Sequence, residues 1–398
     1  MDKYLFICGV LPSDENVEKN TKNFIQFAAE NYQRNIISGF KKNKINLISI
    51  STPFIGSYPL NYKKIFFKAK KKVNDIVYLS FNNIWGLRNF SRYKSLKRYV
   101  VNNIKPNENL KVIIYSPHTP FVKLSKLFKR KYPSIEICLI VPDLPQYMNL
   151  KEKKTLIYRF FKKIDIYLFN KYISFVDKFV FLTKDMNEVV NKYNKEYIVI
   201  EGIASDNQNI FKPNGRTKSN KIIVYTGLIN ERFGIEKLIN AFKAIPSVDI
   251  ELHFYGTGDF VEYVVEQSKS NNRIKYFGIV NRSFSTEVQI NADVLVNPRF
   301  GNSEYLKFSF PSKIIEYLNS GNPVVSYKLE GIPEEYDDVL FYPLDESVEQ
   351  LSKTLMNLCY LNNKERKVLF ERQRKFLRSK NDQNATLKIL KLIKGENW

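Results

Sequence analysis

Apolar residues along the chain gather in short runs, separated by longer stretches in which they recur with a helical period. A short apolar run bounded by breaking residues is typical of a buried strand, whereas a period of about 3.6 residues is typical of a helix that packs on a sheet. In the first half, the strand-like runs are residues 4–10, 45–50, 76–79, 111–115, 135–141, 179–182 and 197–201. Strands that alternate with helices predict an α/β fold with a doubly wound parallel sheet.

The same alternation continues in the second half, which predicts a second sheet. Its strand-like runs are residues 221–225, 250–255, 274–280, 293–296, 324–325 and 339–342, followed by helical patterns at 347–360, 364–378 and 383–393. Between the halves, residues 202–220 are rich in Ser, Asn, Asp and Gly, as linkers are. We therefore predict two Rossmann-like domains, residues 1–205 and 221–380, joined by a linker at 206–220 and followed by a tail at 381–398.

Arg299 is a candidate phosphate ligand. It follows the predicted strand at 293–296 almost directly, so it lies at a strand's carboxyl end. Ligands of open α/β sheets bind at that end, and a guanidinium group matches the geometry of phosphate. A structural ion pair would explain the arginine equally well. Both interpretations stay open at the sequence level.

A helix with a polar outer side is predicted next, from about residue 311 to 320. Pro311 fits its first turn, and Ser309 or a neighbour would cap it. Ile314, Ile315 and Leu318 share one face, whereas Ser312 and Glu316 lie on the other. A helix N-terminus attracts phosphate, so a nucleotide would place its pyrophosphate there and its ribose on Glu316. An outward glutamate is otherwise ordinary solvated surface.

The stretch FPSKIIEYLNSGNPVV, followed by GIPEEY, resembles the donor-binding signature of family 4 (group 1) glycosyltransferases of bacterial surface-polysaccharide type. The resemblance implies the GT-B fold, in which two Rossmann-like domains face each other across a cleft. It also implies that residues 381–398 form a tail helix that crosses back to the N-terminal domain. In this family two glutamates spaced E-x7-E contact the donor sugar and the ribose. Glu316 matches the second, but the first falls on Phe308, and Glu304 is the nearest carboxylate upstream.

The family's phosphate loop corresponds to residues 226–234, which contain Gly227. The usual arginine and lysine of that loop are replaced by Leu228 and Phe233. Arg232 would then neutralise the donor diphosphate, together with Lys313 and Arg299. Because these cations and the helix dipole supply the charge, we expect no bound metal and no cofactor beyond the nucleotide diphosphate-sugar substrate.

Three residues of the first half are candidates for the acceptor side. His118 follows the predicted strand at 111–115 in a loop between prolines, and Asp143 follows the strand at 135–141 in the same way. A single histidine is more often structural than catalytic, but many relatives carry a histidine here that contacts the reacting sugar. Asp143 would orient an acceptor hydroxyl or stabilise its turn. Gly9 lies in the first strand-to-helix loop, which in GT-B enzymes lies beside the acceptor.

Composition supports a folded protein, with 398 residues of which 44% are apolar. Cys8, Cys138 and Cys359 are far apart, so we expect buried, unpaired side chains in a reducing compartment. The N-terminal segment is interpreted as a strand rather than a signal peptide, and no apolar stretch approaches the roughly 20 residues that span a bilayer. We therefore expect a cytoplasmic protein.

The net charge of +23 is concentrated in one half of the chain. Residues 1–200 contain 36 Lys and Arg against 15 Asp and Glu, whereas residues 201–398 are nearly neutral. This asymmetry favours an anionic surface as partner of the first domain, and we expect the inner face of the cell membrane. The candidate segments are residues 62–73, which we favour, 121–131, which we expect to be an ordinary helix on the sheet, and 156–173.

Together with these residues, the resemblance implies a retaining, metal-independent, hexosyltransferase-like enzyme of polysaccharide or glycan biosynthesis. It would move a sugar from a nucleotide diphosphate-sugar to a carbohydrate or lipid-linked saccharide. A basic nucleic-acid-binding protein is a weaker alternative, because Lys, Arg and aromatic residues interleave in two segments, 61–73 and 88–99, that we interpret as helical. A membrane-docked nucleotide-binding partner with weak catalysis is another, because the first glutamate and the usual loop cations are missing.

Overall fold

The computed structural model describes residues 2–12, 15–22, 27–69, 73, 75–104, 109–146, 156–205, 220–301 and 304–396. The chain divides into two compact units. Unit 1 comprises residues 1–203 and 381–398, and unit 2 comprises residues 204–380. Of the predicted linker, residues 206–219 lie outside the described part of the chain.

In the described part of unit 1, seven parallel strands form one sheet in the order β4-β2-β1-β6-β7-β8-β9. The chain moves outward from β1 to β4, returns to the middle and continues from β6 to β9. This reversal between β1 and β6 is the topological switch point of a doubly wound sheet, so the predicted fold class is confirmed. The strands are β1 (Lys3–Cys8), β2 (Leu47–Ser51), β4 (Ile76–Tyr78), β6 (Leu110–Tyr115), β7 (Glu136–Val141), β8 (Lys178–Phe181) and β9 (Glu196–Val199).

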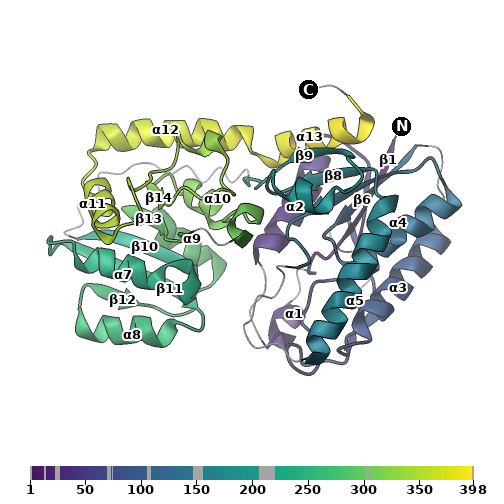
Figure 1. Ribbon diagram of the computed structural model, residues 1–398, viewed down its shortest axis with the longest axis horizontal. Coiled ribbons are helices and arrows are strands. Elements are labelled where there is room, and N and C mark those ends of the chain that lie inside the picture. Colours follow the sequence, from purple (N-terminus) through teal and green to yellow (C-terminus); the bar gives the residue numbers. More distant parts are fainter. Residues whose placement is uncertain are drawn as a thin grey trace. The chain divides into compact units, whose positions relative to one another are not determined.

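Helices cover the sheet of unit 1, and α3, α4 and α5 lie side by side (Figure 1). The helices of this unit are α1 (Glu15–Asn20), α2 (Phe27–Lys42), α3 (Arg88–Asn103), α4 (Thr119–Lys131), α5 (Leu156–Tyr172), α6 (Met186–Val190) and α13 (Asp382–Lys394). In α4 the apolar stripe Phe121, Leu124 and Phe128 is fully buried. The expectation that residues 121–131 form an ordinary helix on the sheet is therefore confirmed.

The C-terminal helix α13 lies against α2, near the other end of the sequence. Asp382 receives a hydrogen bond from Ser38 at 2.6 Å and pairs with Lys42 at 2.8 Å. A Cβ atom on Gly39 would come within 2.1 Å of the carbonyl oxygen of Asp382, so only glycine allows the two helices to approach this closely. The last helix is thus held to unit 1 by both charge and backbone contact.

The described residues of unit 2 form a five-stranded parallel sheet in the order β12-β11-β10-β13-β14. It has the same plan, with its switch point between β10 and β13. The strands are β10 (Lys221–Leu228), β11 (Ile250–Thr257), β12 (Ile274–Tyr276), β13 (Val294–Asn297) and β14 (Val324–Ser326). The helices are α7 (Ile235–Lys243), α8 (Val261–Ser270), α9 (Arg282–Ile290), α10 (Lys313–Leu318), α11 (Val348–Cys359) and α12 (Asn363–Ser379).

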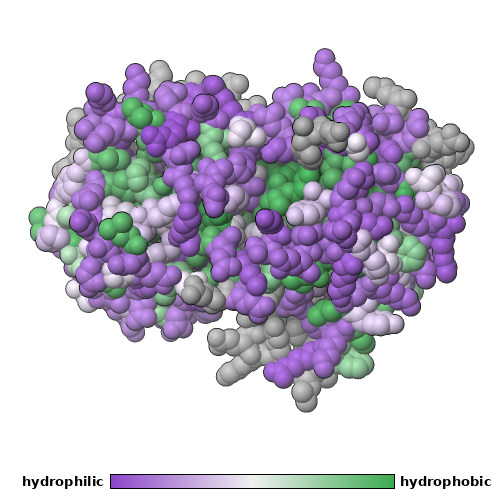
Figure 2. All heavy atoms as spheres, turned by 45° about the horizontal axis from the view of Figure 1, so that its top comes forward, coloured by the Kyte–Doolittle hydropathy of each residue, from purple (hydrophilic) through white to green (hydrophobic). Residues whose placement is uncertain are grey.

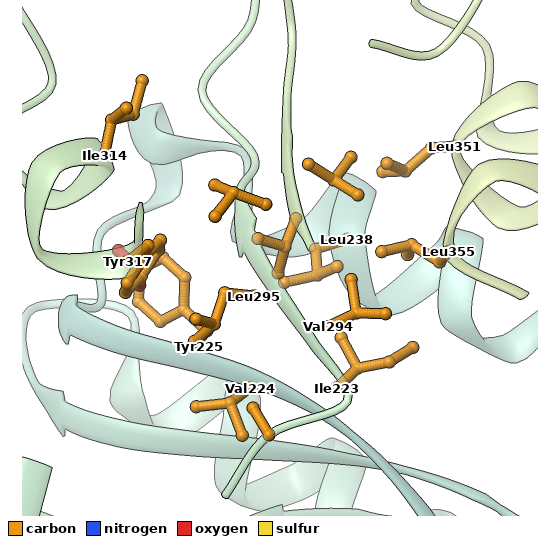
Figure 3. Packing of buried hydrophobic residues seen from close by; sticks show 14 of the residues in the cluster. Ile223, Val224, Tyr225, Leu238, Val294, Leu295, Ile314, Tyr317, Leu351 and Leu355 are labelled. Carbon is orange, nitrogen blue, oxygen red and sulfur yellow. The ribbon is translucent and has the colours of Figure 1, made fainter. Parts of the chain in front are cut away.

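The core of unit 2 packs on both faces of this sheet (Figure 3). Ile223 and Val294, which are partners in register, lie on the side of α7 and α11, while Leu295 lies toward Tyr317 of α10. All three strand residues are completely buried. A parallel sheet covered on both faces needs apolar residues at consecutive positions, which is why its strands read as unbroken apolar runs.

Three sequence predictions were wrong in detail. Residues 339–342 form no strand, and Phe341 makes only an isolated bridge to Val325. Residues 61–73 are not helical in their described part, because β3 (Phe66–Phe67) pairs with β5 (Phe81–Asn82) in an antiparallel ribbon. Helix α10 has six residues and begins at Lys313, so it is shorter than the predicted helix at 311–320.

On the face of the molecule seen in Figure 2, hydrophilic side chains predominate and hydrophobic ones reach the surface in separate patches. Cys8, Cys138 and Cys359 are buried and unpaired, as expected. Among the residues described, no helix has both the length and the apolar character needed to cross a membrane.

Candidate functional site

The carboxyl edge of the unit 2 sheet carries most of the residues that the sequence singled out. Gly227 lies near the end of β10, and Arg299 follows β13, so the two flank the switch point at which ligands of such sheets bind. Lys313 and Glu316 come from α10, and the side chain of Lys313 would contact a Cβ atom on Gly227 at 3.5 Å. Four of the predicted donor residues therefore meet at one edge.

The ring of Phe233 brings Arg232 and Arg299 together. The guanidinium carbon of Arg299 lies 4.0 Å from the ring centroid, and that of Arg232 lies at 5.2 Å. Gly234 makes this approach possible, because it has a φ of +78° and a Cβ atom there would lie 2.0 Å from the carbonyl oxygen of Pro298. The phenylalanine that replaces the family's lysine thus organises two arginines at the site.

Lys313 and the arginines of this edge differ in their partners. Lys313 pairs with Glu316 at 2.6 Å. Burial acts to lower the pKa of Lys313, but the charge and hydrogen bond of Glu316, together with Tyr317, raise it above its ordinary value, while Arg282 of α9 acts in the opposite sense. Burial also lowers the pKa of Arg299. Tyr225 and Tyr305 act to raise this pKa, and the charge of Arg232 acts to lower it further.

No carboxylate within the described ranges forms an ion pair with Arg232, Arg282 or Arg299. The structural ion pair considered for Arg299 is therefore not formed with any described residue. Arg232, Arg282 and Arg299 thus have no acidic partner among the described residues, which favours the binding of an anion such as a diphosphate.

Tyr317 fixes α10 to the end of β10. Its hydroxyl accepts a hydrogen bond from the backbone N–H of Thr226 at 3.0 Å and donates one to the carbonyl oxygen of the same residue at 3.0 Å. Burial of Ile314, Ile315 and Leu318 confirms the predicted inner face of the helix, whereas Ser312 is exposed and its side chain makes no capping bond. Tyr317 and Arg282 were not predicted from the sequence, although Tyr317 follows Glu316 within the motif.

The position of the missing first glutamate has a structural role in this chain. Phe308 is buried at the end of the 3-10 helix Glu304–Phe308. Glu304, at the other end, is exposed. A carboxylate at position 308 would be buried, whereas Glu304 is free to face a ligand in solvent.

In unit 1 the three predicted residues lie at the carboxyl ends of neighbouring strands. Gly9 follows β1, His118 follows β6 and Asp143 follows β7. A Cβ atom on Gly9 would come within 2.4 Å of the ring of Phe54, and this ring meets that of His118 edge-on at 5.7 Å. Gly9 is thus needed for packing next to His118.

His118 is half-buried and has one buried partner. Its Nε2 atom lies 3.1 Å from Nη1 of Arg92. Burial, followed by the charges of Arg92 and Arg88, holds the pKa of His118 well below its ordinary value. Arg92 is a residue that the sequence analysis missed, although it shares the buried stripe of α3 with Leu96 and Val100.

Asp143 is exposed and lies close enough to Tyr115 to influence its ionisation. Burial of Tyr115, then the neighbouring Tyr32 and the carboxylate of Asp143, raise the pKa of the phenol well above its ordinary value. Tyr115 ends β6, so Asp143 and His118 belong to the same edge of the sheet.

Known proteins support this description at two levels. Residues 220–359 match the family described as glycosyl transferases group 1. No curated protein matches the sequence. Among solved structures, the lipopolysaccharide outer core galactosyltransferase WaaB is similar with a TM-score of 0.64 and 13% identity, over 99% of both chains.

Two further structures share the fold. The sucrose-phosphate synthase of Thermosynechococcus elongatus has a TM-score of 0.65 and 12% identity, covering 99% of this chain and 98% of its own. WaaG, a glycosyltransferase involved in lipopolysaccharide biosynthesis, has a TM-score of 0.58 and 14% identity, covering 98% and 100%. The chain therefore has the GT-B fold, with two Rossmann-like domains. Residues 220–359, which lie in the second unit, are similar to the group 1 glycosyltransferases, in agreement with the resemblance seen in the sequence.

Proposed function

We propose that the protein transfers a sugar from a nucleotide diphosphate-sugar to a saccharide or lipid-linked saccharide acceptor, with retention, in polysaccharide or glycan biosynthesis. The observation that carries this proposal is the cluster of Arg232, Arg299 and Lys313 at the switch point of unit 2, with Glu316 beside it. A diphosphate supplies the negative charge that Arg232 and Arg299 lack, and a ribose supplies hydroxyl donors for the carboxylate.

The donor would lie along the carboxyl edge of the unit 2 sheet. Its diphosphate would contact Arg232, Arg299 and Lys313 near Gly227, with Ser312 and Arg282 close by. Glu316 would accept hydrogen bonds from the ribose, and Glu304 would approach the sugar in place of the missing first glutamate. Charge from side chains makes a metal ion unnecessary for binding the diphosphate. We therefore expect full activity in the presence of EDTA.

The acceptor side would be formed in unit 1. His118 would contact the reacting sugar, Asp143 would orient an acceptor hydroxyl, and Gly9 would allow close packing of the loop. Replacement of His118 by Ala should therefore reduce turnover but leave the affinity for nucleotide diphosphates unchanged, since these bind to unit 2. The names of WaaB and WaaG, both tied to lipopolysaccharide, favour a glycolipid or polysaccharide acceptor.

Thermal unfolding in the presence of UDP, GDP, ADP and CMP tests the donor site. A ligand at about 100 times its dissociation constant stabilises the folded protein by about 2.7 kcal/mol. We expect one nucleoside diphosphate to raise the melting temperature, and the Arg299→Gln variant to lose this response. Proton NMR of the product from the matching nucleotide-sugar would then show whether the anomeric configuration is retained. If no nucleotide stabilises the protein, or the product is inverted, the proposal fails.

We also propose that unit 1 docks on an anionic membrane surface in the cytoplasm. Two described regions combine exposed apolar side chains with cations. In one, Phe66 is 51% exposed next to the lysines Lys64 and Lys68. In the other, α5 exposes Phe160, at 62%, and Phe161 between Arg159 and Lys162. Such pairing is typical of interfacial segments.

A further inference from the structure

Arg92 of α3 is a buried cation without an acidic partner. Only 2% of it is exposed, its Nη2 donates to the carbonyl oxygen of Pro53, and its guanidinium carbon lies 4.5 Å from the ring centroid of Phe81. No carboxylate in the described part of the chain pairs with it. An unpaired charge is expensive to bury, so its presence here calls for a role beyond packing.

The contact of Arg92 with His118 determines where the imidazole carries its proton. A guanidinium group has only donors, and it stays protonated in proteins. At 3.1 Å from Nη1, the Nε2 atom of His118 must therefore accept. An imidazolium ion has no acceptor nitrogen, so this hydrogen bond requires a neutral ring with its proton on Nδ1.

The surroundings of His118 favour the same state. Arg88 lies one helical turn before Arg92 and donates to the carbonyl oxygen of Ile55 at 3.0 Å, which adds a second positive charge on this side. From α5, Asp165 accepts a hydrogen bond from Thr119, the next residue along the chain. Burial and the two arginines keep the pKa of His118 well below its ordinary value, so the ring stays neutral near neutral pH.

Two aromatic rings hold the imidazole in place. Phe54 and Phe121 both meet it nearly perpendicularly, at 83° and 79°, with centroid distances of 5.7 and 5.3 Å. No described residue accepts a hydrogen bond from its Nδ1 atom. The ring is therefore fixed in orientation and in tautomer, with one N–H donor that no described residue uses.

We propose that Arg92 is a positioning residue, which fixes the tautomer of His118 so that Nδ1–H donates a hydrogen bond to an oxygen of the reacting sugar. This proposal rests on the function proposed for His118 above. It also defines what His118 does not do: with Nε2 occupied and Nδ1 protonated, the ring serves as a hydrogen-bond donor and not as a general base.

Histidine-selective ¹⁵N labelling of the full chain tests the tautomer directly. The sequence contains two histidines, so a His253→Gln variant assigns the signals of His118. We expect a protonated Nδ1 and an unprotonated Nε2 at neutral pH, and the same pattern at about pH 6, below the ordinary pKa of histidine. A protonated Nε2, or an imidazolium ion at neutral pH, would overturn the proposal.

Variants of Arg92 test whether this state matters for catalysis. Arg92→Met should lower kcat by about tenfold, the value of one hydrogen bond, without changing nucleotide affinity. The pKa of His118 should also rise when the neighbouring charge is lost, and the ¹⁵N signals of the imidazole measure this rise as pH is lowered. Arg92→Lys keeps a cationic donor, so it should restore part of the rate and should fold even if the Met variant does not.

The outcomes separate this inference from the proposed function. An unchanged tautomer and an unchanged pH titration of the His118 imidazole in Arg92→Met would overturn the positioning role of Arg92, whatever the activity. Full turnover in His118→Ala would instead remove His118 from the proposed reaction, and the presentation of Nδ1–H to the sugar would fail with it.

Discussion

Glu316 forms an ion pair with Lys313 at the donor edge, with a distance of 2.6 Å between their charged atoms. If it also accepts hydrogen bonds from the ribose, Glu316→Gln should weaken nucleotide binding by roughly 1.5–3 kcal/mol, since charged acceptors form the stronger hydrogen bonds. Both side chains are about one-third exposed, so the lost ion pair should cost little stability. Isothermal titration with the matching nucleoside diphosphate measures the effect. Unaltered affinity would show that Glu316 does not contact the nucleotide.

His118 should make stability depend on pH in a defined direction. Burial and two arginines lower its pKa in the folded state, while the unfolded chain has an ordinary histidine pKa near 6.5. Below that pH the unfolded state binds the proton and the folded state does not, so the free energy of unfolding falls as pH decreases. One proton corresponds to at most about 1.4 kcal/mol per pH unit. Urea unfolding at several pH values should show this slope in the wild type and a smaller one in His118→Gln; equal slopes would contradict a depressed pKa.

The sequence located site residues where their role depends on position along a strand. Arg299, His118 and Asp143 all follow apolar runs, and all lie at carboxyl ends of strands. Tyr317 and Arg92 were not predicted, because their roles depend on tertiary contacts. Tyr317 forms a hydrogen bond with the backbone of Thr226, and Arg92 makes a buried contact with His118. A tyrosine or arginine on a helix resembles ordinary surface until the partner is known.

At the scale of elements, strands β10 and β11 approach each other closely where they reach the site. Gly256 pairs with Gly227 in register and has a φ of +138°, and a Cβ atom there would lie 1.8 Å from the carbonyl oxygen of Gly227. Backbone strain and the clash together should make Gly256→Ala cost at least about 3 kcal/mol of unfolding free energy. Nucleotide affinity should fall as well, because the end of β10 is displaced.

Gly278 provides a matched control for this substitution. Its φ is also positive, at +73°, but nothing lies within 4 Å of the site of a Cβ atom. Gly278→Ala should therefore cost only the backbone term, roughly 1–2 kcal/mol. Denaturant unfolding of both variants measures the difference, and equal costs would show that the close approach of the two strands is not essential.

The strands that were predicted correctly are those that have apolar surroundings on both faces of the sheet. Strands covered on both faces by helices require unbroken apolar runs, so the sequence revealed each strand of the two parallel sheets. The ribbon of β3 and β5 has no such cover on both sides. Strand β3, which exposes Phe66 and buries Phe67, lies in a lysine-rich segment and was therefore not predicted. Residues 339–342 are apolar because Val339 and Leu340 are buried in the core, and within this segment only Phe341 pairs with the sheet, through its bridge to Val325.

For the whole molecule, charge and exposed apolar surface coincide in unit 1. The excess of positive charge lies in residues 1–200, as counted from the sequence. Within α5, Phe160, Ile164 and Tyr167 are spaced to form one stripe, and all three are exposed. Phe161 meets Trp85 edge-on at 5.5 Å, which extends this surface to the turn before α3. A soluble partner would need complementary acidic and apolar surface, whereas an anionic bilayer provides both at once.

Cosedimentation with liposomes tests this membrane surface. Each lysine near an anionic leaflet contributes about 1 kcal/mol, so changing Lys63, Lys64 and Lys68 to Gln should weaken binding by roughly 3 kcal/mol, and by less at high salt. The other three lysines of this segment, Lys70, Lys71 and Lys72, lie outside the described residues and are left unchanged. Replacing Phe160 and Ile164 by Ser should weaken binding by roughly 2 kcal/mol, through lost burial of apolar area.

The control must remove the same charge from elsewhere. Lys353, Lys364 and Lys367 are exposed on unit 2, the nearly neutral part of the chain, and their triple Gln variant should bind anionic vesicles like the wild type. If this control loses as much affinity as the unit 1 lysine variant, attraction depends on net charge alone and no specific surface exists. If the Phe160 and Ile164 variant binds normally while the lysine variant does not, contact is made by residues 62–69 without insertion of α5. If the wild type binds neither anionic nor neutral vesicles, the membrane proposal is wrong, and the cationic half must bind another anionic partner.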